Sequence, residues 1–216
     1  MQKAYRMVRF LRWGAGIRTG VGEAEPGQWP LNERSEFSES RSNPPRRTMK
    51  YLVVNASSNA KGGTAKFVSA FTDAASKLGE VQALNLHDSP PRCSRGPTMN
   101  EGPLSAYQQS VFECDALFIA SPTYWFSAPA ILKAFIEELD EIDTRLYSRP
   151  RALGIAVYAP QGGELGVVSS LAFALNHLNF ALVEVGYIFH RGVPEDDWAW
   201  EDITLMPERM KRTIGA

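Results

Sequence analysis

The sequence has few features that would tie it to nucleic acid, a membrane or a metal. Its 216 residues include 23 Lys and Arg against 24 Asp and Glu, so no overall basic field would attract nucleic acid. No uninterrupted apolar stretch approaches the roughly 20 residues that span a bilayer. The two cysteines, Cys93 and Cys114, are too few for a disulfide framework or a four-ligand metal site. We therefore expect a cytoplasmic globular protein with reduced thiols that binds neither nucleic acid nor membranes.

Residues 1–48 differ in composition from the rest of the chain. They contain nine Lys and Arg and five Glu, a net charge of +4, which leaves −5 for the other residues out of the total of −1. Residues 26–48 hold four Pro and four Ser but too few apolar groups to offset the loss of chain entropy. We interpret residues 1–48 as a disordered or loosely attached basic extension and residues 49–216 as one domain. Residues 1–22 have no acidic residue, so organelle targeting is an alternative to a tail without a role.

Beyond the extension, short apolar runs alternate with amphipathic stretches. The apolar runs predict strands at 50–55, 81–86, 116–120, 152–158 and 181–189. Helical spacing of apolar residues predicts helices at 64–78, 104–113, 127–146 and 164–179. Strands that are apolar throughout are buried on both faces, and their alternation with helices is typical of parallel sheets. We predict a three-layer, doubly wound α/β domain with a five-stranded parallel sheet in the order 2-1-3-4-5, in which Glu184 marks the last strand as an edge.

In such a sheet the ligand binds beyond the carboxyl ends of the strands, here at loops 57–64, 121–126 and 159–164. The first loop offers two hydroxyls, an Asn and two glycines directly before a helix. Free amides and the dipole at that end of a helix favour a phosphate. The loop matches neither the Walker nor the G-x-G-x-x-G pattern. The alternative is a plain turn in which Thr64 caps the helix.

The second loop places three consecutive aromatic residues, Tyr124, Trp125 and Phe126, at the end of a strand. Three neighbouring side chains cannot all face one core, so some are expected to face the cleft and contact a planar heterocycle. The alternatives are a hydrophobic lid over the strand ends or an oligomer contact. The third loop again offers glycine backbone, at Gly162 and Gly163.

These stretches resemble one family. Residues 121–140, SPTYWFSAPAILKAFIEELD, are similar to the SPxYWxSxxxxLKAFIDR stretch of the NADPH-dependent FMN reductases, a flavodoxin-like group that includes NAD(P)H:quinone reductases. Residues 56–66, ASSNAKGGTAK, are similar to the family's GSPRKxGNTAK phosphate loop, although Gly63 replaces the Asn and Ser58-Asn59 replaces Pro-Arg. The QGG at 161–163 resembles its third flavin loop. Only Cys93 remains of a cysteine-rich loop found in many relatives, so an iron–sulfur cluster is not supported.

The resemblance implies that the first loop binds the phosphate of FMN, whereas the other two border the isoalloxazine ring. The residues concerned are Ser57, Asn59, Lys61, Gly62, Gly63 and Thr64 in the first loop, Pro122, Thr123, Tyr124 and Trp125 in the second, and Gln161, Gly162 and Gly163 in the third. No protein side chain is expected to be catalytic, because the flavin itself takes up the hydride.

The expected function is therefore an FMN-dependent oxidoreductase that moves electrons from NADPH or NADH through FMN to a quinone, a flavin or another small acceptor. We expect a homodimer or homotetramer. One alternative is a flavodoxin-type electron carrier, although such carriers tend to be more strongly acidic than this domain. Another is a flavin-free phosphate-binding module, which would not take up FMN.

Overall fold

The computed structural model describes residues 48–59, 61–93, 102–188 and 198–215. The extension proposed for residues 1–48 lies outside these ranges, apart from Thr48. The domain boundary therefore stays a prediction.

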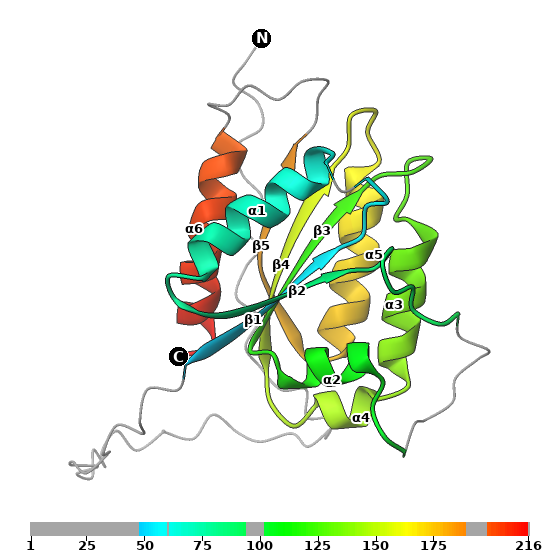
Figure 1. Cartoon of the computed structure of the whole chain (residues 1–216), viewed down its shortest axis with the longest axis vertical. Helices are drawn as coiled ribbons and strands as arrows, with labels where there is room; N and C mark the ends of the chain where they lie inside the picture. The colour runs from blue at the N-terminus through cyan, green and yellow to red at the C-terminus, as the bar shows by residue number, and fades with distance from the viewer. Residues whose placement is uncertain (1–47, 60, 94–101, 189–197, 216) are drawn as a thin grey trace, which may run out of the picture. The chain divides into compact units, whose positions relative to one another are not determined.

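The described residues form one five-stranded parallel sheet in the order β2-β1-β3-β4-β5 (Figure 1). The strands are β1 (Met49–Asn55), β2 (Gly79–Asn85), β3 (Ala116–Pro122), β4 (Arg151–Tyr158) and β5 (Phe180–Ile188). The predicted strand order is confirmed, and so is the edge position of the strand that contains Glu184.

Helices cover both faces of the sheet (Figure 1). They are α1 (Gly63–Ala75), α2 (Ala106–Glu113), α3 (Ala130–Asp140), α4 (Asp143–Leu146), α5 (Glu164–His177) and α6 (Trp198–Thr213). One apolar cluster joins the sheet to α1 and α6, and a second joins its other face to α2, α3, α4 and α5. The predicted three-layer, doubly wound architecture is confirmed. Among the described residues, no helix has both the length and the apolar character to cross a membrane.

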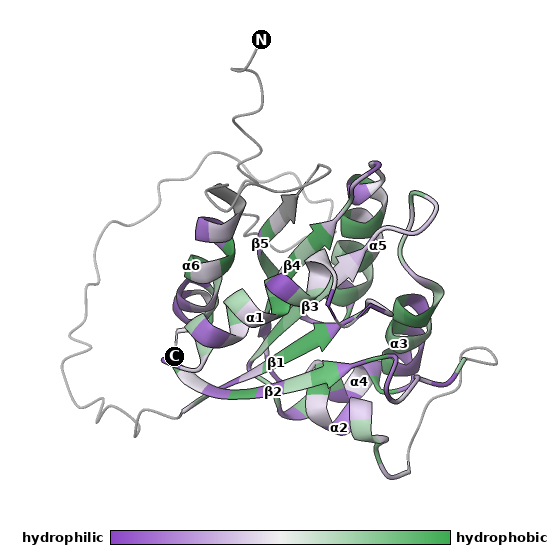
Figure 2. Ribbon diagram, turned by 45° about the horizontal axis from the view of Figure 1, so that its top comes forward, coloured by the Kyte–Doolittle hydropathy of each residue, from purple (hydrophilic) through white to green (hydrophobic). Residues whose placement is uncertain are grey.

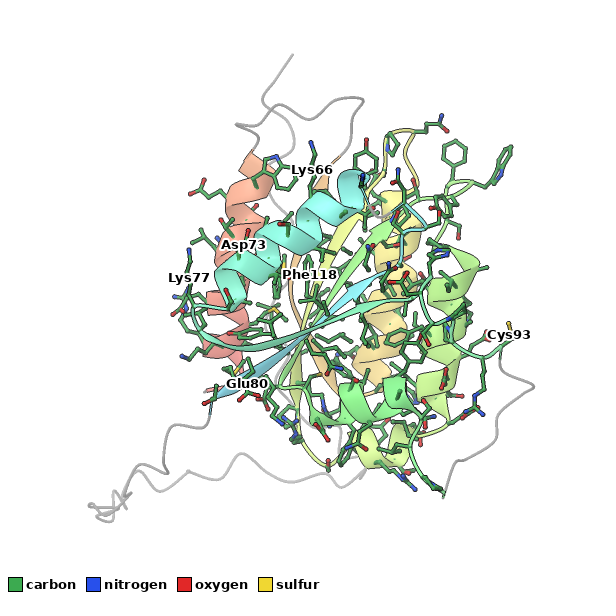
Figure 3. All side chains as sticks on the ribbon, in the orientation of Figure 1. Lys66, Asp73, Lys77, Glu80, Cys93 and Phe118 are labelled. Atoms are coloured by element: carbon green, nitrogen blue, oxygen red, sulfur yellow. The ribbon has the colours of Figure 1, made fainter. Side chains whose placement is uncertain are left out.

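Neighbouring residues of the central strands enter different clusters because successive side chains point to opposite faces. In β1, Tyr51 and Val53 pack toward α1 and α6, whereas Leu52 and Val54 pack toward the other helices. All four are buried, and Figure 2 shows the hydrophobic character of β1 and β3 between the helical layers. On the α1 side, Phe118 of β3 stacks on a phenylalanine of α1 with ring centroids 4.0 Å apart (Figure 3).

Two helical predictions were incomplete. The predicted helix at 127–146 is divided into α3 and α4 because the backbone at Ile142 leaves helical geometry, at φ −124° and ψ 23°, while its side chain is fully buried. No element was predicted for the C-terminal residues, where α6 lies. Pro207 stands inside α6, and an internal proline argues against a helix when only the sequence is considered.

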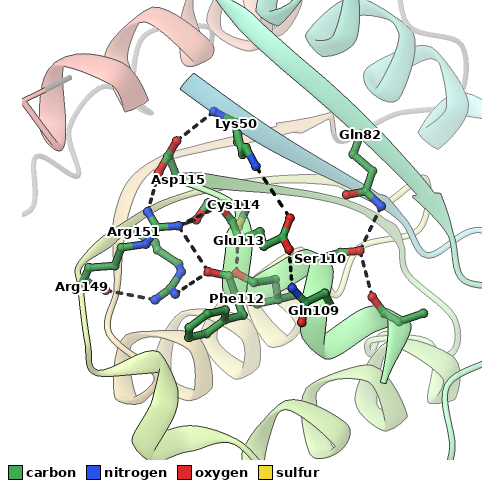
Figure 4. A network of polar contacts seen from close by, with 12 residues as sticks. Lys50, Gln82, Gln109, Ser110, Phe112, Glu113, Cys114, Asp115, Arg149 and Arg151 are labelled. Carbon is green, nitrogen blue, oxygen red and sulfur yellow. Dashed lines mark hydrogen bonds and ion pairs between the residues drawn. The ribbon is translucent and has the colours of Figure 1, made fainter. Parts of the chain in front are cut away.

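At the amino edge of the sheet, two arginines bind the carboxyl end of α2 (Figure 4). Arg149 donates to the carbonyls of Glu113 and Cys114 at 2.8 and 2.7 Å, and Arg151 donates to the carbonyl of Phe112 at 2.8 Å. These bonds satisfy carbonyls that a helix end leaves unpaired. Arg151 is fully buried, and burial lowers the pKa of its guanidinium. The network is structural and lies at the opposite edge from the three loops described next.

Candidate functional site

The loops that follow β1, β3 and β4 meet at the carboxyl edge of the sheet. The hydroxyl of Ser58 in the first loop lies 3.0 Å from the hydroxyl of Tyr124 in the second. The amide of Thr123 donates to the carbonyl of Tyr158, the last residue of β4, at 3.0 Å. The structure thus joins three segments that are far apart in the sequence.

The first loop is folded by its own polar side chains. The amide of Ser57 donates to Asn55 Oδ1 at 3.0 Å, and the amide of Asn59 donates to Ser57 Oγ at 3.1 Å. The amide of Lys61 donates in turn to Asn59 Oδ1 at 3.0 Å. Such side-chain acceptors hold a turn without secondary structure. Ser57 is buried, whereas the side chains of Asn59 and Lys61 are exposed.

The loop ends at an amino terminus of α1 that no side chain of the described residues caps. The cap residue is Gly62, in extended conformation, and no acidic residue occupies the first turn. The alternative in which Thr64 caps the helix is therefore wrong; Thr64 lies inside the first turn and is only 1% exposed. The amides and the helix dipole favour an anion there. The exposed Lys61, just before the helix, adds positive charge nearby. So does the exposed Lys66 of α1, which Figure 3 labels.

The second loop is a tight two-residue turn. Tyr124 and Ser127 exchange both backbone hydrogen bonds, at 2.9 and 3.1 Å, across Trp125 and Phe126. These two residues have φ of +49° and +61°, which is the pattern of a type I′ turn and is unusual for aromatic residues. Trp125 is 95% exposed, so it does not form a lid packed over the strand ends. The preceding Pro122 is buried, and Thr123 is half-buried.

The backbone of the third loop has a conformation that requires glycine at two positions. Gly162 and Gly163 have φ of +96° and +91°, a region that glycine adopts without steric cost. A Cβ added to Gly163 would also lie 2.6 Å from the carbonyl carbon of Phe126. Glycine at this position lets the second loop rest on the start of α5. Gln161 is exposed beside them.

Three residues of this edge make contacts that the sequence analysis did not predict. Ser58 bonds to Tyr124, Phe126 contacts Gly163, and Tyr158 packs against Gly63. Each depends on a contact between distant segments, and the sequence alone contains no signal for it.

The comparison with protein families identifies the cofactor of the chain. The model of the family described as NADPH-dependent FMN reductase matches residues 49–192, a range that includes all three loops. The chain belongs to the NADPH-dependent FMN reductase family. Its cofactor is therefore FMN and its co-substrate is NAD(P)H, and its general activity is flavin-dependent oxidoreduction. Among curated proteins, none matches the chain in sequence.

Solved structures agree on the fold of this FMN reductase family member. RosB with a bound 8-demethyl-8-formylriboflavin-5'-phosphate intermediate aligns with a TM-score of 0.63 and 13% identity, covering 78% of this chain and 79% of RosB. The apo form of the NADH:FMN oxidoreductase EMOB aligns with a TM-score of 0.57 and 15% identity. The alignment covers 77% of this chain and 90% of EMOB. A flavodoxin from the domain Archaea aligns with a TM-score of 0.56 and 14% identity, covering 78% and 100%. At such identities the likeness shows a flavodoxin-like fold alone.

The residues of this family member fit FMN at two points. The uncapped start of α1, with Lys61 beside it, suits a phosphate. The second and third loops present exposed aromatic side chains and glycine backbone, which are groups that can give a flat ring system a stacking surface and amide donors. The structure brings both features to one edge of the sheet.

Proposed function

We propose that this chain passes electrons from NAD(P)H through bound FMN to a quinone, a second flavin or another small acceptor. The observation that supports the proposal most is the bond between Ser58 and Tyr124. It holds the loop suited to a phosphate against the loop suited to a ring.

In this proposal each loop has its own task. Ser57 in the first loop and Thr64 in the first turn of α1 bind the phosphate, and Lys61 adds positive charge there. Residues 122–125 border the isoalloxazine, and residues 161–163 approach its polar edge. Bound FMN supplies the hydride and electron transfer, so the protein contributes orientation and electrostatics.

The acceptor must reach the ring from the solvent side of the second loop. Tyr124, Trp125 and Phe126 are all exposed there. Aromatic faces of this kind suit a planar acceptor, which is why we propose quinones and flavins before charged aliphatic compounds.

The decisive experiment is an absorption spectrum of the purified, FMN-loaded protein, followed by anaerobic addition of NADPH or NADH. We expect bleaching of the flavin, then recovery when a benzoquinone or free FMN is added. Flavin that dithionite reduces but neither nicotinamide reduces would instead support the electron carrier. A protein that takes up no FMN would contradict both.

We also propose a homodimer or homotetramer. Leu165 and Phe173 of α5 are 75% and 79% exposed, and the start of this helix adjoins Phe126 of the second loop. Exposed apolar surface of this kind is typical of association. Light scattering on the wild type is expected to give at least twice the chain mass, and Phe173→Glu is expected to shift the mass toward that of one chain.

Finally, we propose a cytoplasmic location. Both cysteines are free thiols, Cys93 exposed and Cys114 buried, as is usual in a reducing compartment. Cell fractionation with an antibody against the chain would test this location against organelle targeting by residues 1–22.

A further inference from the structure

The phenol of Tyr158 stands against the first turn of α1. Tyr158 ends β4 and is half-buried. A Cβ added to Gly63 would lie 2.5 Å from Tyr158 Cε2 and 2.8 Å from Cζ, the carbon that bears the hydroxyl. The absence of a side chain at residue 63 is therefore what lets the ring approach the amino terminus of the helix.

The ring is supported on its other sides. Phe67, one turn further along α1, meets it edge-on with centroids 6.4 Å apart. The carbonyl of Tyr158 accepts from the amide of Thr123, so its backbone is fixed to the second loop. Its hydroxyl, by contrast, makes no hydrogen bond to any residue that the structure describes. A rigidly mounted phenol with a free donor beside uncapped helix amides is arranged to bind an anion.

We infer that Tyr158 is a further ligand of the FMN phosphate and that Gly63 is the residue that makes room for it. The inference rests on the proposed function, which places the phosphate at the start of α1. The hydrogen-bond donor to the phosphate, Tyr158, then lies in strand β4 rather than in the first loop. Tyr158 then makes up in part for the arginine that the first loop lacks, since a neutral phenol donates one hydrogen bond to a phosphate oxygen.

The test compares FMN with riboflavin, which lacks the phosphate, by quenching of flavin fluorescence on the apoprotein. Tyr158→Phe keeps the ring and removes only the donor. We expect its Kd for FMN to rise about tenfold or more, as for loss of a hydrogen bond to a charged group, and its Kd for riboflavin to stay unchanged. Tyr147→Phe is the matched control, because Tyr147 follows α4, away from the three loops, and is exposed; neither Kd should change.

A second variant tests the role of Gly63. The methyl group of Gly63→Ala must displace the phenol, so we expect the same selective loss of FMN affinity. If both changes act on one contact, the double variant should bind FMN no more weakly than Tyr158→Phe alone. Urea unfolding shows that each variant is folded.

Two results would overturn the inference: an unchanged Kd for FMN in Tyr158→Phe, or equal losses for FMN and riboflavin. The failure of the proposed phosphate site would look different. In that case the wild type itself would bind FMN and riboflavin equally well.

Discussion

At the scale of single residues, the most unusual feature is the backbone of Trp125 and Phe126. Both have positive φ, which costs L-residues roughly 1–2 kcal/mol each. Glycine or asparagine would form the same turn with less strain. Strained and exposed aromatic residues beside the proposed cofactor site are expected to contact another molecule.

Replacing Trp125 by alanine shows whether its side chain serves flavin chemistry or the stability of the fold. Because the side chain is 95% exposed, Trp125→Ala should lower the free energy of unfolding by less than about 1 kcal/mol, well below the 3–5 kcal/mol of a buried Trp. Flavin reduction by NAD(P)H or reoxidation by a quinone should become slower in single-turnover measurements. Tyr147→Ala, an exposed aromatic at the other edge, serves as the control. Normal rates beside a severe loss of stability would remove Trp125 from the site.

A substitution at Thr64 tests whether the first turn of α1 binds the phosphate of FMN. Thr64→Ala removes a hydroxyl that the proposed function aims at the phosphate, so FMN should bind roughly tenfold more weakly or worse. Riboflavin binding should change little. Thr72→Ala is the matched control, because Thr72 lies in the same helix and its buried hydroxyl has no partner among the described residues. Equal losses of both ligands in Thr64→Ala would refute the phosphate assignment.

At the scale of elements, α6 completes the layer that begins with α1. Ile203, Met206 and Met210 are fully buried against the sheet. Two glycines of the sheet allow this close packing: a Cβ on Gly154 would overlap the sulfur of Met206, and one on Gly186 would lie 3.1 Å from Ile203. The helix therefore depends on tertiary contacts more than on its own sequence pattern.

The surroundings of Gly154 and Gly166 predict opposite effects on stability when each is replaced by alanine. Gly154→Ala should destabilise the fold by about 1–3 kcal/mol, because the new methyl group overpacks the contact with Met206. Gly166→Ala lies in α5, where its Cβ would meet only the carbonyl oxygen of Phe126 at 3.4 Å. The higher helix propensity of alanine should stabilise that variant by up to about 1 kcal/mol. Urea unfolding measures both, and a neutral Gly154→Ala would show that α6 tolerates displacement.

Tyr51 links β1 to α6 through a hydrogen bond that depends on pH. Its hydroxyl donates to the carbonyl of Pro207 at 3.1 Å. Burial, with added repulsion from Glu208 and Asp115, raises the pKa of Tyr51 from 10.0 to about 12. The folded state thus favours the neutral phenol, and this contribution is complete below pH 10 and lost as the pH rises toward 12.

Tyr51→Phe should accordingly be less stable than the wild type by about 0.5–1.5 kcal/mol at pH 8. The difference between the two proteins should shrink and then change sign between pH 10 and pH 12, because the tyrosine ionises first in the unfolded chain. Other groups that titrate in this range are common to both proteins and cancel. A difference that stays constant up to pH 12 would contradict the link between this hydroxyl and stability.

At the scale of the whole molecule, the charge is divided between two parts of the chain. Residues 1–48 have a net charge of +4 and the remainder −5. The described sheet begins at Met49, which is buried as the first residue of β1. The domain that contains the three loops thus has its own core and its own proposed cofactor site.

We therefore expect a chain that begins at Met49 to fold and to bind FMN as the full chain does. The midpoint of thermal unfolding and the Kd for FMN should both be unchanged by removal of residues 1–48. A midpoint several degrees lower, or lost FMN binding, would show that the extension packs on the domain and that the boundary is wrong.

The sequence by itself determined the sheet order and the edge of the sheet where the three loops meet. The central strands β1, β3 and β4 are mainly apolar, as at Val53 and Phe118, because both of their faces are buried. This pattern can be recognised within a few consecutive residues. The resemblance to the FMN reductases likewise rests on contiguous residues, above all 121–140, and the family match confirms it.

Only the tertiary structure decided the features that depend on distant contacts. α6 contains Pro207, yet it forms because Met206 and Ile203 pack closely against Gly154 of β4 and Gly186 of β5. The left-handed turn at Trp125 is held by hydrogen bonds and by the close approach of Gly163. The pairing of Gly63 with Tyr158 joins residues 95 positions apart. Steric fit of this kind arises between segments that meet only after folding, so no local pattern in the sequence encodes it.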